Sequence, residues 1–447
     1  MKFEKLKQIL DEAAKDAGIV DYEIYYQSGS SLSADALKDE INSFTSSTEG
    51  GICFRCVVDG KQGYASSELL TADALRELPK IALSNAKVSS SEDEMFLFAG
   101  SPSYAKVENV QAAFPEASAL CQSVLELQKS LYAESEAVGD GTQSGIAYFE
   151  DEVYLCNSKG LNLSNRVCGG FRYADVVVRK GEEAENSLAF AYEQDEDACK
   201  ELAQKTVDAA CARFGALTVA SGKYPVVIDG KVFCDFLSAF SPIFSAKNAQ
   251  KGLSRLAGKE GESIASPLVT IVDDPMREGS PIKTPFDGEG VATARREVVK
   301  DGVLTMLLYD LSTAKKAGVA STGNGQKASY AAPVLIAPYQ FSIQPKNKSR
   351  EELLALAKDG IFVTGCKGFH AGADAVTGDF SIESYGFKIR DGKQAEPIKS
   401  FTISGNVFEL FKEIGAVGNT MFWGMPSGFT AFGSPDIFLP SVSVAGE

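Results

Sequence analysis

The stretch Gly386-Phe387-Lys388-Ile389-Arg390-Asp391-Gly392 is the clearest indication of how the second half of the chain folds. A short β-rich run leads into an Asp-Gly pair, which is typical of a strand that enters a tight hairpin turn. Further Asp-Gly pairs near β-rich runs are Asp287-Gly288, Asp301-Gly302 and Asp359-Gly360. We therefore predict a β-rich C-terminal domain over residues 221–447. The helices that we expect within it lie near 231–246, 311–317 and 350–358.

The first part of the chain, residues 1–220, combines helical periodicity with short alternating runs that are typical of strands. It is predicted to be an α/β region with mixed sheets flanked by helices. A Ser-rich and acidic stretch at 88–110 indicates a linker, which would divide the region into 1–87 and 111–220. Together with the C-terminal domain, this pattern predicts an α+β protein.

The length and charge of the chain exclude several classes of protein. Its 447 residues are enough for at least two hydrophobic cores. Asp and Glu number 60 and Lys and Arg number 44, so the formal net charge is −16. A surface this acidic repels phosphate groups. We therefore expect no direct contact with nucleic acid and none with a membrane.

Histidine and cysteine usage limits the catalytic sites that the chain can form. His370 is the only histidine, so two or more histidines cannot meet at a zinc ion within one chain. Any Ser-His-Asp or Cys-His mechanism would need His370. The nine cysteines are scattered, the N-terminus lacks a signal-peptide pattern, and no apolar run reaches membrane-spanning length. These features predict a cytoplasmic protein with reduced thiols.

Two groups of residues are candidates for chemistry. Cys366 and His370 lie four residues apart in a Gly-rich stretch and could form a thiolate–imidazole pair or two metal ligands, but no third ligand is evident. Asp287 and Glu289 flank Gly288 and could bind a cation or share acid–base work. For both groups, a structural loop or turn is the simpler explanation. The residues alone thus define no complete catalytic set.

A series of short stretches in the C-terminal half occurs in a distinctive order. It includes Thr284-Pro285-Phe286-Asp287-Gly288-Glu289-Gly290-Val291, Ser321-Thr322-Gly323-Asn324, Val376-Thr377-Gly378-Asp379-Phe380-Ser381, Ile403-Ser404-Gly405-Asn406 and Ile414-Gly415-Ala416-Val417-Gly418-Asn419. Through these stretches the chain resembles the TldD/PmbA family, also called the modulator-of-DNA-gyrase or U62 peptidase family. The N-terminal half is similar to the family more loosely.

The family has two branches, and this sequence is more similar to the PmbA-like, or TldE-like, branch. TldD-like members resemble zinc peptidases, with a His-Glu-x-x-x-His motif on a helix and a later cysteine ligand. The corresponding residues 233–242 contain neither the histidine nor the following glutamate, and residues 425–430 contain no cysteine. The resemblance therefore implies no catalytic residue and no metal ligand in this chain, and zinc in a TldD-like partner.

This resemblance implies a non-catalytic subunit that pairs with a TldD-like catalytic subunit, with a second copy of itself, or with both. The complex would act in the proteolysis or maturation of peptides and unfolded segments. We expect Asn324, His370, Thr377 and Asp379 to line the substrate cavity. Two alternatives stay open. One is a self-standing hydrolase that uses Cys366 and His370 or the carboxylates, and the other is a homodimeric scaffold that binds peptides without cutting them.

Overall fold

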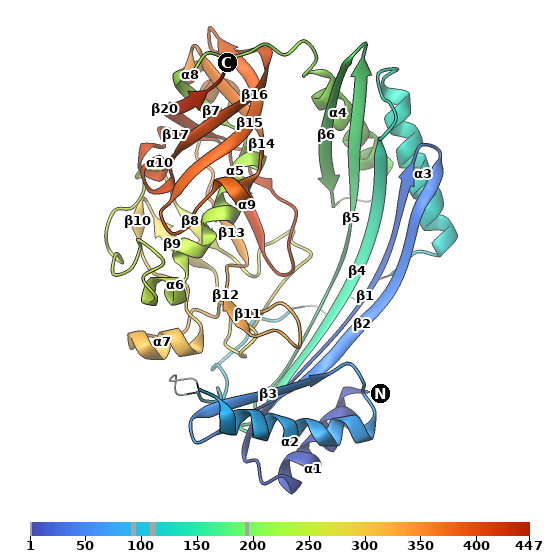
Figure 1. Cartoon of the computed structure of the whole chain (residues 1–447), viewed down its shortest axis with the longest axis vertical. Coiled ribbons are helices and arrows are strands. Elements are labelled where there is room, and N and C mark those ends of the chain that lie inside the picture. Colours follow the sequence, from blue (N-terminus) through green and yellow to red (C-terminus); the bar gives the residue numbers. More distant parts are fainter. Residues whose placement is uncertain (1, 91–94, 108–112, 193–195) are drawn as a thin grey trace.

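The computed structural model describes residues 2–90, 95–107, 113–192 and 196–447. A sheet of long strands from the first half of the chain lies beside a domain formed by the second half (Figure 1). Helices and strands are both abundant, and short strands dominate the second half, so the predicted α+β class is confirmed. In the described part of the chain, no helix is long and apolar enough to cross a membrane.

The N-terminal region is built on one six-stranded sheet. Its strands are β1 (Asp21–Leu37), β2 (Glu40–Val58), β3 (Lys61–Ser67), β4 (Gln143–Asn157), β5 (Asn162–Lys180) and β6 (Glu183–Ala191). They lie in the order β3-β2-β1-β4-β5-β6, and each neighbouring pair is antiparallel. Because β1 pairs with β4, strands from the segments 1–87 and 111–220 are neighbours in the same sheet.

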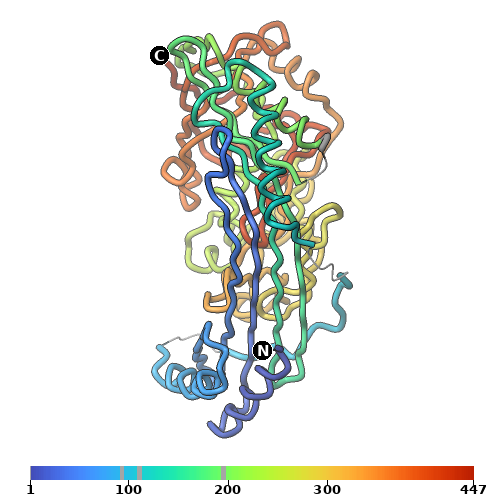
Figure 2. The backbone as a smooth tube through the Cα atoms, turned by 90° about the vertical axis from the view of Figure 1, so that its right-hand side faces the viewer, coloured from blue at the N-terminus to red at the C-terminus, as the bar shows by residue number. Residues whose placement is uncertain are grey.

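Helices cover the two ends of this sheet. At one end lie α1 (Phe3–Asp16) and α2 (Ala72–Val88), and at the other lie α3 (Ala117–Glu134) and α4 (Glu196–Cys211) (Figure 1). Figure 2 shows the long strands running side by side from α1 and α2 toward the opposite end. The apolar stripe of α1, which includes Leu6 and Leu10, packs with Leu75 of α2 and with Ile24 and Phe54 of the sheet.

The segment 88–110, predicted as a linker, begins at the end of α2. Residues 91–94 and 108–110 lie outside the described residues. Residues 95–107 form no helix or strand, yet they hydrogen-bond to the C-terminal domain. The Tyr104 hydroxyl donates to the carbonyl oxygen of Gly290 (2.8 Å), and the backbone N–H of Ala292 donates to the Ser101 hydroxyl (2.9 Å). This segment therefore links the two regions through contacts as well as through the chain.

The C-terminal domain contains short strands and helices. Its strands are β7 (Gly222–Ile228), β8 (Ile271–Asp273), β9 (Arg296–Lys300), β10 (Val303–Leu304), β11 (Gly325–Lys327), β12 (Val334–Ile336), β13 (Gln340–Ile343), β14 (Gly360–Lys367), β15 (Asp379–Arg390), β16 (Lys393–Asn406), β17 (Ala416–Val417), β18 (Phe422–Trp423), β19 (Ala431–Ser434) and β20 (Ile437–Ala445). Its helices are α5 (Gly230–Phe240), the 3-10 helix η1 (Ser241–Phe244), α6 (Ala246–Gln250), α7 (Leu311–Ala317), α8 (Arg350–Ala357), α9 (Phe369–Gly372) and α10 (Val407–Glu413). The three predicted helices correspond to α5 with η1, to α7 and to α8.

The strands of this domain form sheets in the orders β16-β15-β14-β7-β20-β17, β10-β9-β8-β13-β19-β18 and β11-β12. Two pairings, β14 with β7 and β13 with β19, are parallel. Mixed pairing is thus present, but in the C-terminal domain and not in the N-terminal region for which we predict it. In the N-terminal sheet, short turns join β1 to β2 and β4 to β5, and a turn of that length can connect only antiparallel neighbours.

Two of the four Asp-Gly hairpin predictions are confirmed. Asp301-Gly302 joins β9 to β10, and Asp391-Gly392 joins β15 to β16. Both residues of each pair have positive φ, as a two-residue hairpin turn requires. The other two predictions are wrong. Asp287-Gly288 forms a buried turn in which the aspartate side chain accepts backbone N–H groups, and Asp359-Gly360 connects α8 to β14.

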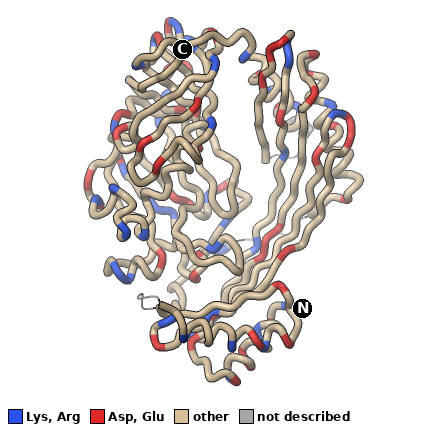
Figure 3. Tube along the Cα trace, in the orientation of Figure 1, with Lys and Arg blue, Asp and Glu red and all other residues tan. Residues whose placement is uncertain are grey.

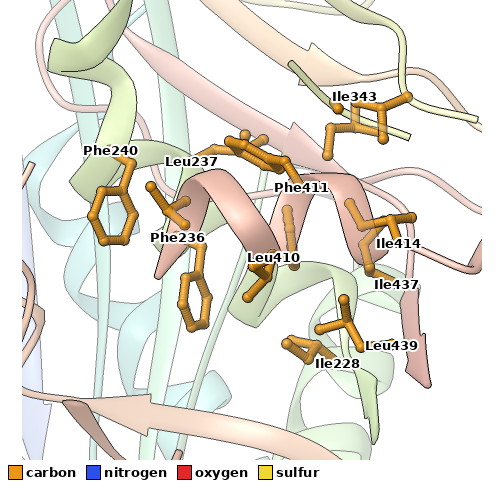
Figure 4. Packing of buried hydrophobic residues seen from close by; sticks show 14 of the residues in the cluster. Ile228, Phe236, Leu237, Phe240, Ile343, Leu410, Phe411, Ile414, Ile437 and Leu439 are labelled. Atoms are coloured by element: carbon orange, nitrogen blue, oxygen red, sulfur yellow. The ribbon is translucent and has the colours of Figure 1, made fainter. Parts of the chain in front are cut away.

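The largest hydrophobic core of the C-terminal domain surrounds α5. Figure 4 shows Phe236, Leu237 and Phe240 of α5 beside Leu410 and Phe411 of α10. These five side chains are almost completely buried. Helix α5 is therefore a central packing element, with its apolar face turned into the domain.

Candidate functional site

A cavity of about 690 Å³ lies between the N-terminal sheet and the C-terminal domain. Alternate residues of a strand face the same side of a sheet, and one wall accordingly contains Gln27 of β1 together with Phe149 and Asp151 of β4. The opposite wall is formed by β11 and the residues after it, and by residues 425–429. This volume is in the range of pockets that hold small ligands, so we take the cavity as the candidate functional site.

Lys327, the last residue of β11, brings a positive charge to the cavity. Its side chain is only 5% exposed, and its ammonium nitrogen lies 4.3 Å from the centre of the Tyr25 ring. Burial lowers the pKa of Lys327. Among the described residues, no carboxylate forms an ion pair with it. The cavity thus contains a desolvated ammonium group that an anion could reach.

The turn at Asp287 fixes the position of β11. Asp287 Oδ2 accepts the backbone N–H of Gly325 (2.9 Å), and Oδ1 accepts the backbone N–H of Glu289 (2.9 Å). The backbone N–H of Gly288 donates to the carbonyl oxygen of Gly325 (2.7 Å). A Cβ atom at Gly288 would lie 2.7 Å from Cγ of Lys327. Only glycine therefore lets the lysine side chain pass over this turn.

Three carboxylates lie buried near this turn: Asp287, Glu289 and Asp310. Burial and mutual repulsion raise the pKa of Asp287 and of Glu289. Each carboxylate also has a backbone partner. Glu289 Oε2 accepts the N–H of Leu311 (2.8 Å), and Asp310 caps α7 by accepting the N–H of Thr313 (2.8 Å). Turn formation and helix capping therefore account for this cluster without a catalytic role.

A buried ion pair lies on the sheet close to these carboxylates. Arg55 of β2 donates to Glu23 of β1 through two bonds, Nε to Oε1 (3.1 Å) and Nη2 to Oε2 (2.9 Å). Both side chains are more than nine-tenths buried. The positive charge of Arg55 also acts on Glu289. The contact between the two regions thus contains several charged groups within a small volume.

Asn324, one of the predicted cavity residues, is buried in a hydrogen-bond network. Its amide donates to Asp273 Oδ2 (2.7 Å) and to the carbonyl oxygen of Ala337 (3.1 Å), and its oxygen accepts from the Thr322 hydroxyl (2.7 Å). Burial raises the pKa of Asp273 to about 6. The network holds the loop before β11 in place, so Asn324 positions Lys327 without lining the cavity itself.

The other three predicted residues lie in a different part of the C-terminal domain. Asn406 joins two of them, because its amide donates to the carbonyl oxygen of Thr377 (2.9 Å) and to Asp379 Oδ1 (2.8 Å). His370 is exposed on α9. The structure therefore places Thr377 and Asp379 together. The walls of the 690 Å³ cavity, as the described residues form them, include none of the four predicted residues.

The described residues do not fit a catalytic zinc ion. The inward side chains of α5, where the resemblance places a ligand helix, include Phe236, Leu237 and Phe240. Cys366 is half-buried, its thiol lies 3.2 Å from the Ser384 hydroxyl, and burial raises its pKa to about 12. In the described ranges, no group of three or more His, Cys, Asp or Glu residues could hold a metal ion. A hydrolytic zinc needs three such ligands.

Comparison with protein families identifies the chain. The model of the PmbA/TldA metallopeptidase C-terminal domain matches residues 221–446, and the model of PmbA/TldA metallopeptidase domain 1 matches residues 22–86. The chain belongs to the PmbA/TldD family. The predicted resemblance is thus confirmed, and the second match covers β2, β3 and all but the first residue of β1 in the N-terminal sheet.

Similar proteins agree with this assignment. A metalloprotease of Methanothermobacter thermautotrophicus is 30% identical over 62% of this chain and 57% of its own length, so this chain spans little more than half of that relative. Metalloprotease PmbA of Escherichia coli O157:H7 is 24% identical over 99% of this chain and 98% of its own. A Thermotoga maritima protein described as a modulator of a DNA gyrase has a TM-score of 0.89, 28% identity, and coverage of 99% and 100%.

Sequence reasoning did not identify the charged group at the cavity. Lys327 lies three residues after Asn324, the end of the Ser321-Thr322-Gly323-Asn324 stretch, but a lysine in a short polar run ordinarily predicts an exposed side chain. Gln27 and Asp151 come from strands that are far apart in the sequence and adjacent only in the folded sheet. The nearest signal was the family stretch Ser321-Thr322-Gly323-Asn324, which ends just before β11 begins.

Proposed function

We propose that this chain is a PmbA/TldE-like subunit that binds no catalytic zinc and assists a zinc-bearing, TldD-like subunit in cutting peptides or unfolded segments. The observation that carries this proposal is the packing of α5. On the helix that corresponds to the family's ligand helix, the inward residues Phe236, Leu237 and Phe240 belong to the hydrophobic core and are each 1% exposed, whereas Ser238 is exposed. Full-length similarity to a metalloprotease named PmbA supports the branch.

Packing around α5 supports the proposal that this helix holds no zinc. The Phe236 ring makes edge contacts with Phe369 and Phe380, with centroids 4.9 Å and 5.3 Å away. Removing these rings from the core to make room for a hydrated metal would leave a large cavity, which is costly. The chemistry would therefore be carried out by the partner, and this chain would supply part of the substrate chamber.

Charge is consistent with a peptide substrate and a protein partner. Acidic and basic residues are interspersed over both regions (Figure 3), and the net charge is −16. We place the complex in the cytoplasm and expect a heterodimer with the TldD-like subunit, a homodimer, or both. The cavity beside Lys327 would lie within the part of the chamber that this chain contributes.

The test compares the isolated chain with a mixture. Purified chain is analysed for zinc and assayed with fluorescein-labelled casein, alone and with a TldD-like protein from the same genome. We expect no stoichiometric zinc and cleavage only in the mixture. A partner variant with Gln in place of the glutamate of its His-Glu-x-x-x-His motif is the matched control and should abolish cleavage. One zinc per chain, or chelator-sensitive cleavage by the chain alone, would refute the proposal.

A further inference from the structure

Lys327 brings to the cavity a buried positive charge that forms no ion pair with any described residue. The ammonium group of Lys327 is desolvated, contacts the face of Tyr25 and forms no ion pair with a described carboxylate. A buried charge without a partner costs free energy that a ligand of opposite charge can recover. A second cavity of about 30 Å³ shares Gln326, Lys327 and Phe429 with the large one, so the lysine lies where the two meet.

The surroundings of Lys327 are mainly apolar. Leu335, Ala337 and Phe429 line the wall on the side of the C-terminal domain, and Phe149 and Phe171 line the sheet. Such walls favour aliphatic and aromatic side chains, because burial of their surface is favourable. A small inorganic anion would leave most of this surface uncovered. The ligand should therefore combine an anionic end with apolar groups.

Asp151 places a negative charge in the cavity at some distance from the positive charge of Lys327. Asp151 pairs with Gly29 in the sheet, and Tyr25, which lies under Lys327, is four residues earlier in the same strand. Four residues of a strand span about 13 Å. The cavity thus has a positive group near one end and a negative group further along the strands. An extended chain of a few residues, with a carboxylate at one end and a basic group or amine upstream, would match both charges.

The wall also holds a polar atom without a hydrogen-bond partner. The side-chain oxygen of Gln27 is buried and accepts no hydrogen bond from any described residue. Buried amide oxygens normally have a donor. A peptide N–H would supply one, whereas a fatty acid or an aromatic acid has no such group. This difference favours a peptide over other carboxylates with an apolar body.

We propose that this cavity binds the C-terminal end of a peptide, with its free carboxylate at Lys327 and its apolar side chains against the aromatic walls. The inference rests on the proposed function in taking the ligand to be a peptide. It goes beyond that function, because it gives this chain a recognition site of its own. The chain would then select free C-terminal ends for the chamber, independently of the zinc of the partner.

The experiment measures peptide binding by isothermal titration calorimetry with the isolated full chain, without partner and without zinc. The probes are acetyl-Lys-Ala-Ala-Phe with a free carboxylate, the same peptide as a C-terminal amide, and 3-phenylpropionate. We expect the free acid to bind at least about tenfold more tightly than the amide, since a hydrogen bond to a charged group is worth more than one to a neutral group. We expect 3-phenylpropionate to bind more weakly than the peptide acid.

Two variants assign the effect to the lysine. Lys327→Met keeps the length of the side chain and removes the charge, so the two peptides should bind it equally. Lys259→Met removes a lysine that is exposed and paired with Glu262, and it should behave as the wild type. Thermal unfolding checks that both variants fold. If Lys327→Met does not fold, the contrast between acid and amide in the wild type still decides.

Several results would overturn the inference. They are equal binding of acid and amide by the wild type, no binding of either, a contrast that persists in Lys327→Met, and 3-phenylpropionate binding as tightly as the peptide acid. If partner-dependent cleavage of casein occurs together with any of these, the proposed function stands and this inference fails. If the acid is selected but no partner restores cleavage, the inference stands and the proposed function fails.

Discussion

Helix α5 and the cavity beside Lys327 differ in the kind of side chains that they bury. The inward face of α5 consists of aromatic and aliphatic side chains, among them Phe233 and Phe236, which are at most 1% exposed. The contact between the sheet and β11 instead buries Lys327, the Arg55–Glu23 pair and three carboxylates. Both regions are well packed, but one gains stability from apolar burial alone and the other must compensate buried charge.

This difference indicates which region of the chain holds charged groups that could bind a ligand. A region that carries metal ligands in TldD-like relatives, as the resemblance implies, is hydrophobic core in this chain. Buried charges are retained only where partners or ligands compensate them. In this chain the buried charged groups thus lie at the contact between the two regions, whereas the inward face of α5 contributes apolar packing. The predictions below test each half of this comparison.

The largest effect is expected for Phe236→Ala in α5. Deletion of a buried aromatic ring removes apolar burial and leaves a cavity, so the free energy of unfolding should fall by about 3–5 kcal/mol. Urea denaturation followed by circular dichroism measures it. Ser238→Ala, at an exposed position of the same helix, is the matched control and should change stability by no more than about 0.5 kcal/mol. A loss below about 1 kcal/mol for Phe236→Ala would contradict a core role for α5.

A slightly smaller effect is expected for Arg55→Met in the sheet. The substitution leaves Glu23 buried without its partner, which should cost about 3 kcal/mol. The double variant Arg55→Met with Glu23→Gln should recover part of this loss, because neither position of the pair then holds an unpaired charge. Arg76→Met removes an exposed arginine near Asp73 and should be close to neutral. Additive losses in the double variant would show that the pair is not coupled.

Sequence patterns predicted the C-terminal domain better than the cavity, for a physical reason. A hairpin turn depends on the residues of the turn itself, so Asp301-Gly302 and Asp391-Gly392 could be recognised locally. Asp287-Gly288 has the same local pattern, but its environment is buried and the aspartate binds backbone groups of β11 and of its own turn. Local propensity cannot distinguish these two situations.

The candidate site depends on pairings between distant strands. Asp151 and Gln27 reach the same wall because β1 pairs with β4 across more than a hundred residues. Nothing in the sequence around either residue predicts that register. The family stretches pointed to Asn324. Its hydrogen bonds to Asp273 and Ala337 hold the loop before β11, so Asn324 positions the strand that carries Lys327.

The smallest effect, and the one with a pH signature, is expected for Glu289→Gln. The pKa of Glu289 is raised above its ordinary value of 4.5, chiefly by burial and then by the charge of Asp287. The folded chain therefore keeps a proton that the unfolded chain releases as the pH rises above about 4.5. A group that binds more protons in the folded state makes stability fall with increasing pH over that range.

Removal of the titrating group should remove this fall. At about pH 8 the Glu289→Gln variant should be more stable than the wild type by about 1–2 kcal/mol, and the difference should shrink toward about pH 5. Glutamine can still accept the N–H of Leu311 through its amide oxygen. Urea denaturation at both pH values measures the effect, with Glu262→Gln, at an exposed carboxylate, as the control. If the variant is less stable by the same amount at both pH values, the folded chain keeps Glu289 ionised. The charged groups near β11 would then balance one another. The contrast with α5 would lie in how the polar groups near β11 are paired, and burial of these groups would not carry a net cost in stability.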